Sequence, residues 1–446
     1  MAEHDPAVAW SLLSSSFVHS FDYFLRVNPF EIVGAALKKV DDLMNDQLIP
    51  LLTRKDFVPD LSVAGYSRIR ALMSLPNRKG GINIPVFSNP VTGVILRRAS
   101  LSMTVRYTDA LEWRKPFGLV DPEFRSTEYV DPPEIRSNVR LEKSRLLHDP
   151  ILRDIYTNPD CHRIQQLRVL ENEEAGTNSW MGTGYWQRSV SFPSCPRDFR
   201  DMVCGRFLIP LAGVLPTCPK HPNEQWNESH SADCAHLRHG PRNSAHSSLQ
   251  YLIASSCKTG KDKLLPQIEM VRLENQIDHF VGASANRVPD HEERRLRLDI
   301  QISGLYGIGS NVVSDITGVN RVNAASQAKV GRPGNFRSRD EVLQSWLDLV
   351  GEKKRLKVAK YKRYWGSTTF QVLVFSTGGM LAPEFKRLLV KIGEIRKSHL
   401  KRPGEVKRIL QRAHYKICHS IVQAYRGKGN IHPVTDNTDV PPLVDF

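Results

Sequence analysis

Two acidic residues and a lysine-rich segment between Arg297 and Tyr361 have the types and spacing that metal-dependent hydrolysis of a phosphodiester requires. Asp299 and Asp315 offer carboxylates, the hard oxygen ligands that hold Mg²⁺, and a bound Mg²⁺ lowers the pKa of an attacking water. Lys357 or Lys360 can stabilise the negative charge that develops on the phosphate. This segment therefore predicts a magnesium-dependent nuclease site.

Both carboxylates lie in expected strands. Apolar and polar side chains alternate over residues 296–302, which predicts a half-buried strand with Asp299 on its polar face. Residues 312–317 form a second short apolar stretch that contains Asp315, and the glycine-rich residues 304–309 between the two stretches are typical of a turn. If these strands are antiparallel neighbours, the two carboxylates lie side by side.

The lysines lie in an expected helix. Ser338 and Glu341 have the spacing of a capping box, which predicts a helix start, and we expect the helix to continue to Tyr364. Apolar residues then recur at helical spacing, and basic and tyrosine side chains follow along one stripe: Lys353, Lys357, Lys360, Tyr361 and Tyr364. Beyond this helix, residues 370–375 predict a buried strand. Isolated acids on strands and lysines on helices are also common as solvated groups, so the pattern alone leaves both interpretations open.

The motif order Arg-x-Asp299, Asp315 and Lys357-x-x-Lys360-Tyr361 resembles the restriction-like endonuclease domain at the C-terminus of non-long-terminal-repeat retrotransposon proteins. That family carries Arg/Lys-Pro-Asp, a second acid further along and a Lys-x-x-Lys-Tyr helix. The resemblance implies catalytic roles for all five residues of the motif and Mg²⁺ binding by the two aspartates.

The sequence departs from the family pattern at two positions. Leu298 stands where the family has proline, and Thr317 stands where a restriction-type Asp-x-Lys motif has its lysine. The family characteristically lacks that lysine and uses the later helix, so the second departure weighs less. Glu269 is a further candidate, for an acid that nucleases of this fold place on the preceding helix.

A second stretch, residues 75–84 (LPNRKGGINI), is similar to a segment downstream of the reverse transcriptase palm in the same polyproteins. This resemblance implies a fragment or truncated descendant that begins in or after the thumb. The palm's catalytic Asp-Asp pair is missing, because the only such dipeptide, Asp41-Asp42, follows Lys39-Val40 rather than an aromatic and a small residue. We therefore do not expect reverse transcriptase activity from this chain.

Close pairs of cysteine and histidine precede the nuclease segment: Cys218-x2-His221 and His230-x3-Cys234. Such pairs, separated by a short polar loop, let four ligands converge on structural Zn²⁺. Retrotransposon proteins place Cys-x(1 to 3)-Cys and His-x4-Cys here, so His221 replaces a cysteine. His236 and His239 leave the fourth ligand open, and a loop without metal is the alternative.

Basic and amide side chains after these pairs are candidates for phosphate contacts. The family has an Arg-His-Asn element here, to which either Arg238-His239 or Arg242-Asn243 can correspond. A capped helix start explains the same residues. On the later helix, Lys353 and Lys354 are further candidates for binding nucleic acid.

Composition favours a nucleic-acid partner. The 446-residue chain carries a formal net charge of +15, with a pI near 9.5, which fits DNA and also RNA. Seven cysteines, an odd number, argue against a disulfide framework. No stretch has the apolar length of a membrane span, and the first residues do not resemble a signal peptide. We expect an intracellular, nuclear protein with no membrane partner.

We expect a mixed α+β fold in which an all-helical region and a zinc-knuckle-like loop precede a restriction-endonuclease-like domain with a small mixed sheet flanked by helices. The expected regions are a thumb-like helical region (1–110), a linker with short helices (111–200), a zinc-knuckle-like segment (201–258), the nuclease domain (259–400) and a basic helical tail with a disordered end (401–446).

Two functions compete on the sequence alone. The first is a metal-dependent DNA endonuclease that nicks target DNA for target-primed reverse transcription. The second is a catalytically degenerate retroelement remnant that acts as a zinc-containing nucleic-acid-binding module. Leu298 favours the second function, whereas the retained acids and lysines favour the first.

Overall fold

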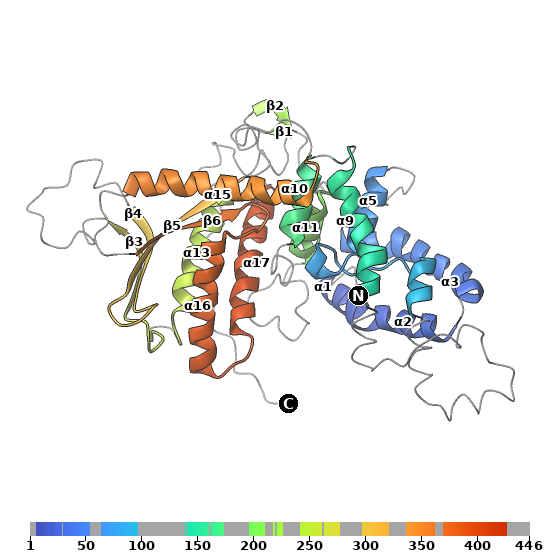
Figure 1. Ribbon diagram of the computed structural model, residues 1–446, viewed down its shortest axis with the longest axis horizontal. Helices are drawn as coiled ribbons and strands as arrows, with labels where there is room; N and C mark the ends of the chain where they lie inside the picture. Colours follow the sequence, from blue (N-terminus) through green and yellow to red (C-terminus); the bar gives the residue numbers. More distant parts are fainter. Residues whose placement is uncertain are drawn as a thin grey trace, which may run out of the picture. The chain divides into compact units, whose positions relative to one another are not determined.

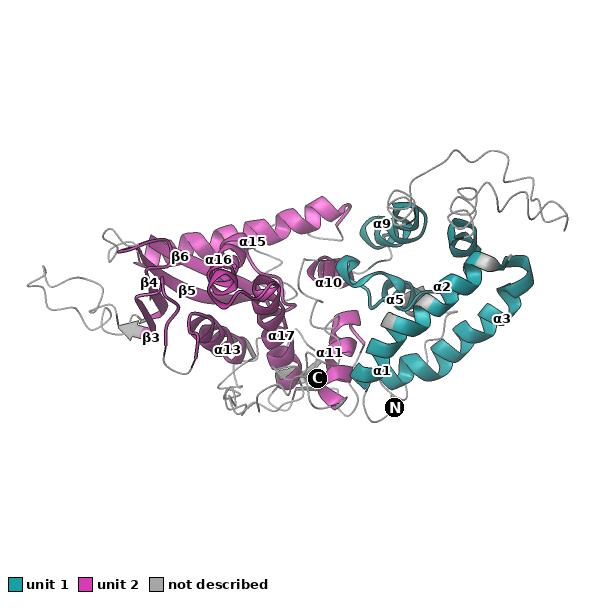
Figure 2. Ribbon diagram, turned by 90° about the horizontal axis from the view of Figure 1, so that it is seen from below, with its two compact units in different colours: residues 1–161 teal, residues 162–446 magenta. Residues whose placement is uncertain are grey.

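A computed structural model divides the chain into two compact units, residues 1–161 and 162–446 (Figure 2). The described residues are 6–28, 30–53, 64–96, 139, 141–159, 161, 163–173, 196–209, 217–218, 221–225, 241–260, 263–276, 297–320, 336–361 and 369–425. They form helices and a small mixed sheet, which confirms the expected mixed α+β class. Within these ranges, none of the helices has an apolar stretch of membrane-spanning length.

Unit 1 is helical wherever it has regular structure in the described residues. Its α-helices are α1 (Pro6–Leu12), α2 (Val18–Val27), α3 (Phe30–Leu43), α4 (Ile49–Leu52), α5 (Ala64–Ser74) and α9 (Asp149–Thr157). Single π-helical turns follow α1 and α3 and precede α9. The described part of unit 1 is thus helical, as expected for the first region of the chain, and α2 ends before Pro29 whereas α3 begins after it.

The backbone conformation of residues 75–84 explains why two glycines, Gly80 and Gly81, occur there. After the 3₁₀ turn Asn77–Lys79, Gly80 adopts φ +90°, a conformation that L-residues with side chains rarely adopt. A Cβ on Gly81 would lie 1.9 Å from the Leu75 carbonyl oxygen, so only glycine fits there. The guanidinium of Arg70 then holds the returning chain by donating to the carbonyl oxygens of Ile84 and Pro85.

A four-stranded sheet forms the centre of unit 2, in the order β3-β4-β5-β6. The strands are β3 (Met270–Gln276), β4 (Arg297–Ser303), β5 (Asn311–Val319) and β6 (Thr369–Ser376). The pairs β3–β4 and β4–β5 are antiparallel, whereas β6 is parallel to β5. Parallel neighbours require a crossover connection, which α15 (Arg339–Tyr361) provides.

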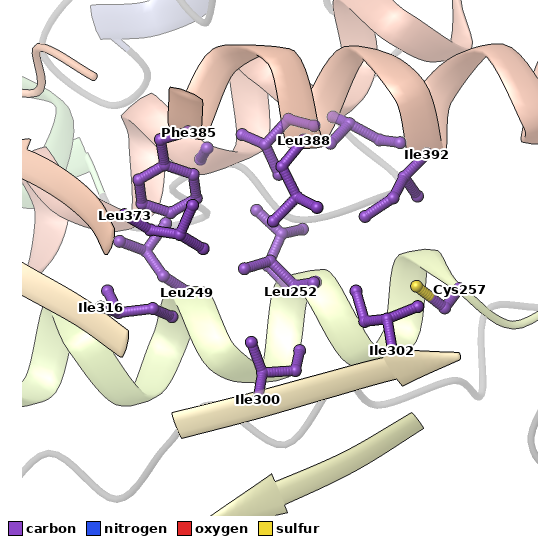
Figure 3. Packing of buried hydrophobic residues seen from close by; sticks show 14 of the residues in the cluster. Leu249, Leu252, Cys257, Ile300, Ile302, Ile316, Leu373, Phe385, Leu388 and Ile392 are labelled. Carbon is purple, nitrogen blue, oxygen red and sulfur yellow. The ribbon is translucent and has the colours of Figure 1, made fainter. Parts of the chain in front are cut away.

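Helices cover both faces of the sheet (Figure 1). On one face, the helices α13 (Pro241–Ser256), α16 (Pro383–Leu400) and α17 (Glu405–Tyr425) share one hydrophobic core with the strands, in which Leu252, Ile300, Leu373 and Leu388 are almost fully buried (Figure 3). Side chains alternate across a strand, so Asp315 points away from this core and toward α15.

Two helices and a hairpin precede α13: α10 (Arg163–Glu173), α11 (Pro196–Phe207) and β1 (Thr217–Cys218) with β2 (His221–Gln225).

Several local predictions are confirmed. The strands expected at 296–302, 312–317 and 370–375 correspond to β4, β5 and β6, and the first two are antiparallel neighbours. The amide of Glu341 donates to the Ser338 hydroxyl at 3.3 Å, as expected at a helix start, although α15 ends at Tyr361 rather than Tyr364. The core of unit 2 also includes residues of α13 and α17, which lie outside the expected nuclease segment 259–400.

Two features of unit 2 differ from the sequence-based expectations. The strand β3 is not predicted by its sequence MVRLENQ, because this stretch alternates for only a few residues. Glu269 does not lie on a helix: it immediately precedes β3, and its carboxylate accepts a hydrogen bond from the Gly309 amide in the β4–β5 turn. Its expected role as an acid on the preceding helix is therefore wrong.

The close approach of α16 and α17 generates a stability prediction. A Cβ on Gly393 would lie 2.7 Å from the Val406 Cα, a backbone atom that cannot move aside freely. We expect Gly393→Ala to lower the free energy of unfolding of unit 2 by about 1–3 kcal/mol, the usual cost of overpacking. Urea denaturation followed by circular dichroism measures this change.

Gly351→Ala is the matched control. Gly351 also lies within a helix, but a Cβ added to it would have no atom within 4 Å. Alanine there should stabilise the helix by about 0.5–1 kcal/mol because glycine is the poorer helix former. Equal effects of the two substitutions would contradict the close packing of α16 against α17.

Candidate active site

Asp299 and Asp315 lie on neighbouring strands. The pairing of β4 with β5 runs from Ser303 opposite Asn311 to Ile300 opposite Ser314. Asp299 and Asp315 are the residues directly next to this last pair on the two strands. The strands thus bring together the two acids that the sequence singled out.

Asp315 is held by three side chains on the face of the sheet that α15 covers. The Lys357 ammonium lies 2.9 Å from Oδ1 and 2.8 Å from Oδ2. The Tyr361 hydroxyl, one turn further along α15, donates to Oδ1 at 3.2 Å, and the Thr317 hydroxyl donates to Oδ2 at 3.0 Å. Because the Asp315 side chain is only 4% exposed, these partners replace the water that a carboxylate would otherwise bind.

Asp299 lies in the gap between the strands. Its Oδ2 accepts a hydrogen bond from the Ile316 amide of β5, so the side chain takes a donor that a strand carbonyl would otherwise bind. The Nε2 atom of His246, on α13, lies 3.0 Å from the same oxygen. A second α13 residue, Gln250, donates to the main-chain carbonyl of Asp299 at 3.2 Å.

The two carboxylates act on a common neighbour, Tyr361. Burial raises the pKa of its phenol, and the nearby negative charge of Asp315, the hydrogen bond to Asp315 and the charge of Asp299 raise it further. The phenol therefore stays protonated at neutral pH and serves as a hydrogen-bond donor. Both aspartates thus lie close enough to one α15 side chain for their charges to act on it.

The other predicted basic residues lie outside this hydrogen-bonded cluster. Lys360 is exposed, and its ammonium lies 5.2 Å from the centre of the Tyr361 ring. Lys354 pairs with Glu384 at the start of α16, and the half-buried Lys353 lies next to it on α15. Of the two lysines expected to be catalytic, Lys357 contacts Asp315, whereas Lys360 is exposed and lies over the Tyr361 ring.

The donor chemistry of the two aspartates fits a hard divalent cation. Proteins hold Mg²⁺ by one or two carboxylates, while water and phosphate oxygens complete its shell. Oδ1 of Asp299 has no hydrogen-bond partner among the described residues. The same residues contain no group of three or more His, Cys, Asp or Glu placed to hold a metal ion.

The zinc prediction falls mostly outside the described residues. Cys218 and His221 are paired across the β1–β2 hairpin, whereas His230 and Cys234 lie outside the described ranges. Among the nucleic-acid-binding candidates, Arg238 and His239 also lie outside them, and Arg242 and Asn243 belong to the first turn of α13, where Asn243 is exposed. The zinc site thus stays a prediction.

Sequence reasoning missed the α13 contribution to the site. His246 and Gln250 are four residues apart and therefore lie on one face of the helix, but no sequence pattern links that face to Asp299. Thr317 was noted only as a departure from a lysine motif, whereas it donates a hydrogen bond to Asp315. The sequence offers only the i, i+4 spacing of these two polar residues, on a helix that carries several other polar side chains.

Comparison of the chain with models of known protein families and with curated protein sequences gives no match.

In the Asp315–Lys357 pair the carboxylate is much more deeply buried than the ammonium, and this difference leads to a stability prediction. Lys357→Met leaves a carboxylate that is almost fully buried without its cation, so we expect the free energy of unfolding to fall by about 1–3 kcal/mol. Lys360→Met, three residues along the same helix, removes an exposed ammonium and should change it by less than about 0.5 kcal/mol. Urea denaturation of both variants measures the difference, and similar values would contradict the pairing of Asp315 with Lys357.

Proposed function

We propose that residues 241–425 form a metal-dependent DNA endonuclease domain of the restriction-like class, related to that of non-long-terminal-repeat retrotransposons. The observation that carries this proposal is the cluster of Asp315, Lys357 and Tyr361 beside Asp299, assembled from two strands and a helix. The mixed four-stranded sheet flanked by helices supports it as well, because this is the architecture that the resemblance implies.

Each residue of the cluster has a chemical role in phosphodiester hydrolysis. Asp299 and Asp315 would hold a divalent cation, which offsets charge on the phosphate and lowers the pKa of a bound water. The Lys357 ammonium, held at the edge of the cluster, stabilises negative charge on the phosphate oxygens as bond breaking proceeds. The protonated Tyr361 phenol donates to Asp315 and fixes its orientation.

The basic composition supports a nucleic-acid substrate. The formal net charge of +15 favours a polyanion, and the exposed Lys360 lies one turn along α15 from Lys357. In this proposal the chain nicks target DNA to prime reverse transcription, while a polymerase palm lies in another protein or segment. DNA as the substrate is also the reason for the expected nuclear location, and RNA is a further partner that the same net positive charge favours.

A second function, nucleic-acid binding without cleavage, is favoured by two particular observations. The Lys357 ammonium lies within 3 Å of both oxygens of Asp315, so a positive charge already neutralises this carboxylate. Leu298, which stands at the family's proline position, is fully buried in β4. A degenerate site would keep this arrangement as a purely structural ion pair and would retain only the affinity for DNA.

Nicking of supercoiled plasmid in the presence of MgCl₂ distinguishes the two functions. We expect the purified chain to convert supercoiled to open-circular DNA, and Asp299→Asn and Asp315→Asn to slow this conversion by about 10²–10³-fold or more, since each removes charge that the reaction needs. Asp348→Asn is the control, because Asp348 is exposed on α15 and, among the described residues, accepts a hydrogen bond from Gln344 alone. It should nick at the rate of the unsubstituted chain.

The binding function would give a different result. The chain would then retain plasmid in a mobility-shift assay, with an affinity that falls steeply as salt rises, but no nicking would occur with Mg²⁺ or Mn²⁺. Nicking that survives both aspartate substitutions would also contradict the proposed site, because it would come from other residues or from a contaminant.

A further inference from the structure

Two residues of α13 hold Asp299 at two points. His246 Nε2 lies 3.0 Å from the carboxylate oxygen Oδ2, and Gln250 Nε2 donates to the main-chain oxygen at 3.2 Å. Four residues separate them, so both project from one face of the helix, one turn apart. Together they fix the side chain and the backbone of the same residue.

The contacts of the Asp299 carboxylate fall on one of its two oxygens. Oδ2 accepts a hydrogen bond from the Ile316 amide and lies 3.0 Å from His246 Nε2, whereas Oδ1 has no hydrogen-bond partner among the described residues. With one oxygen bonded to the Ile316 amide and in contact with His246, the carboxylate cannot rotate freely. The other oxygen is therefore left in one orientation, available to a cation.

We propose that His246 and Gln250 are positioning residues that orient Asp299 so that its Oδ1 binds the divalent cation of the site. The inference rests on the proposed function only for the presence of that cation. Hydrogen-bonding partners of metal-binding carboxylates commonly set ligand orientation, and their loss typically costs 10–100-fold in metal affinity.

The packing of α13 makes it a rigid support for this role. Leu249 and Ile253, next to the two polar residues, are fully buried in the core shared with the sheet (Figure 3). Gln250 is itself only 2% exposed, so its amide has little freedom to leave Asp299. His246 and Asp299 are partly exposed, at 25% and 17%, which leaves the carboxylate accessible to solvent and ions.

Manganese binding by the full-length chain, measured by electron paramagnetic resonance, tests the proposal without requiring catalysis. We expect His246→Ala to weaken Mn²⁺ binding about 10–100-fold. His246→Gln should restore it, because a glutamine amide nitrogen can reach the position of Nε2 and donate to Oδ2. Asp315→Asn identifies the signal that belongs to this site, since it should weaken the same binding.

His419→Ala is a matched control. His419 pairs with Asp198 through Nε2 and Oδ2 at 3.3 Å, with similar exposure, but it joins α17 to α11 rather than to the sheet. This variant should leave Mn²⁺ affinity unchanged. If His246→Ala behaves like His419→Ala and alters only the melting temperature, the pair is structural and the proposal is overturned.

The remaining outcomes separate this proposal from the nuclease proposal. Mn²⁺ binding that depends on His246 without any nicking of DNA would support the positioning role and contradict the nuclease. Nicking that depends on both aspartates, with Mn²⁺ affinity unaffected by His246→Ala, would do the opposite. A full-length chain that binds no Mn²⁺ at this site would overturn the positioning role.

Discussion

The burial of the Asp315 carboxylate is the constraint on which the rest of unit 2 depends. A charged group that is 4% exposed must find compensating charge and hydrogen bonds within the protein, since its loss of hydration is costly. Lys357, Tyr361 and Thr317 provide them, and the first two come from α15. That helix crosses the face of β5 that carries Asp315, and it connects β5 to the parallel strand β6.

The second aspartate occupies a different environment because β4 and β5 cease to pair beyond Ile300. The Asp299 carboxylate accepts a hydrogen bond from the Ile316 amide, so it lies against the backbone of β5. On the other face of the sheet, Ile300 and Ile316 belong to the hydrophobic core that includes Leu249 and Leu252 of α13 (Figure 3). One face of the sheet thus supplies stability, and the gap between its strands supplies the accessible carboxylate.

Much of this arrangement could be predicted because its signals are local. The alternation of apolar and polar residues around Asp299 indicates a strand directly. The Ser338–Glu341 spacing likewise indicates a capped helix start. The role of His246 could not be predicted in this way, because the packing of α13 on the sheet is a tertiary property that brings together residues far apart in the sequence. The short strand β3 was missed because it depends on pairing with β4 more than on its own pattern.

Iron-mediated cleavage of the polypeptide tests most directly whether Asp299 and Asp315 form one cation site. Fe²⁺ binds oxygen ligands at least as tightly as Mn²⁺, and with ascorbate and peroxide it cuts the backbone nearest to its binding site. We predict cuts close to both Asp299 and Asp315, suppressed by excess Mg²⁺ and lost in Asp315→Asn. Cuts near only one of these aspartates, or cuts that persist in Asp315→Asn, would contradict a shared site.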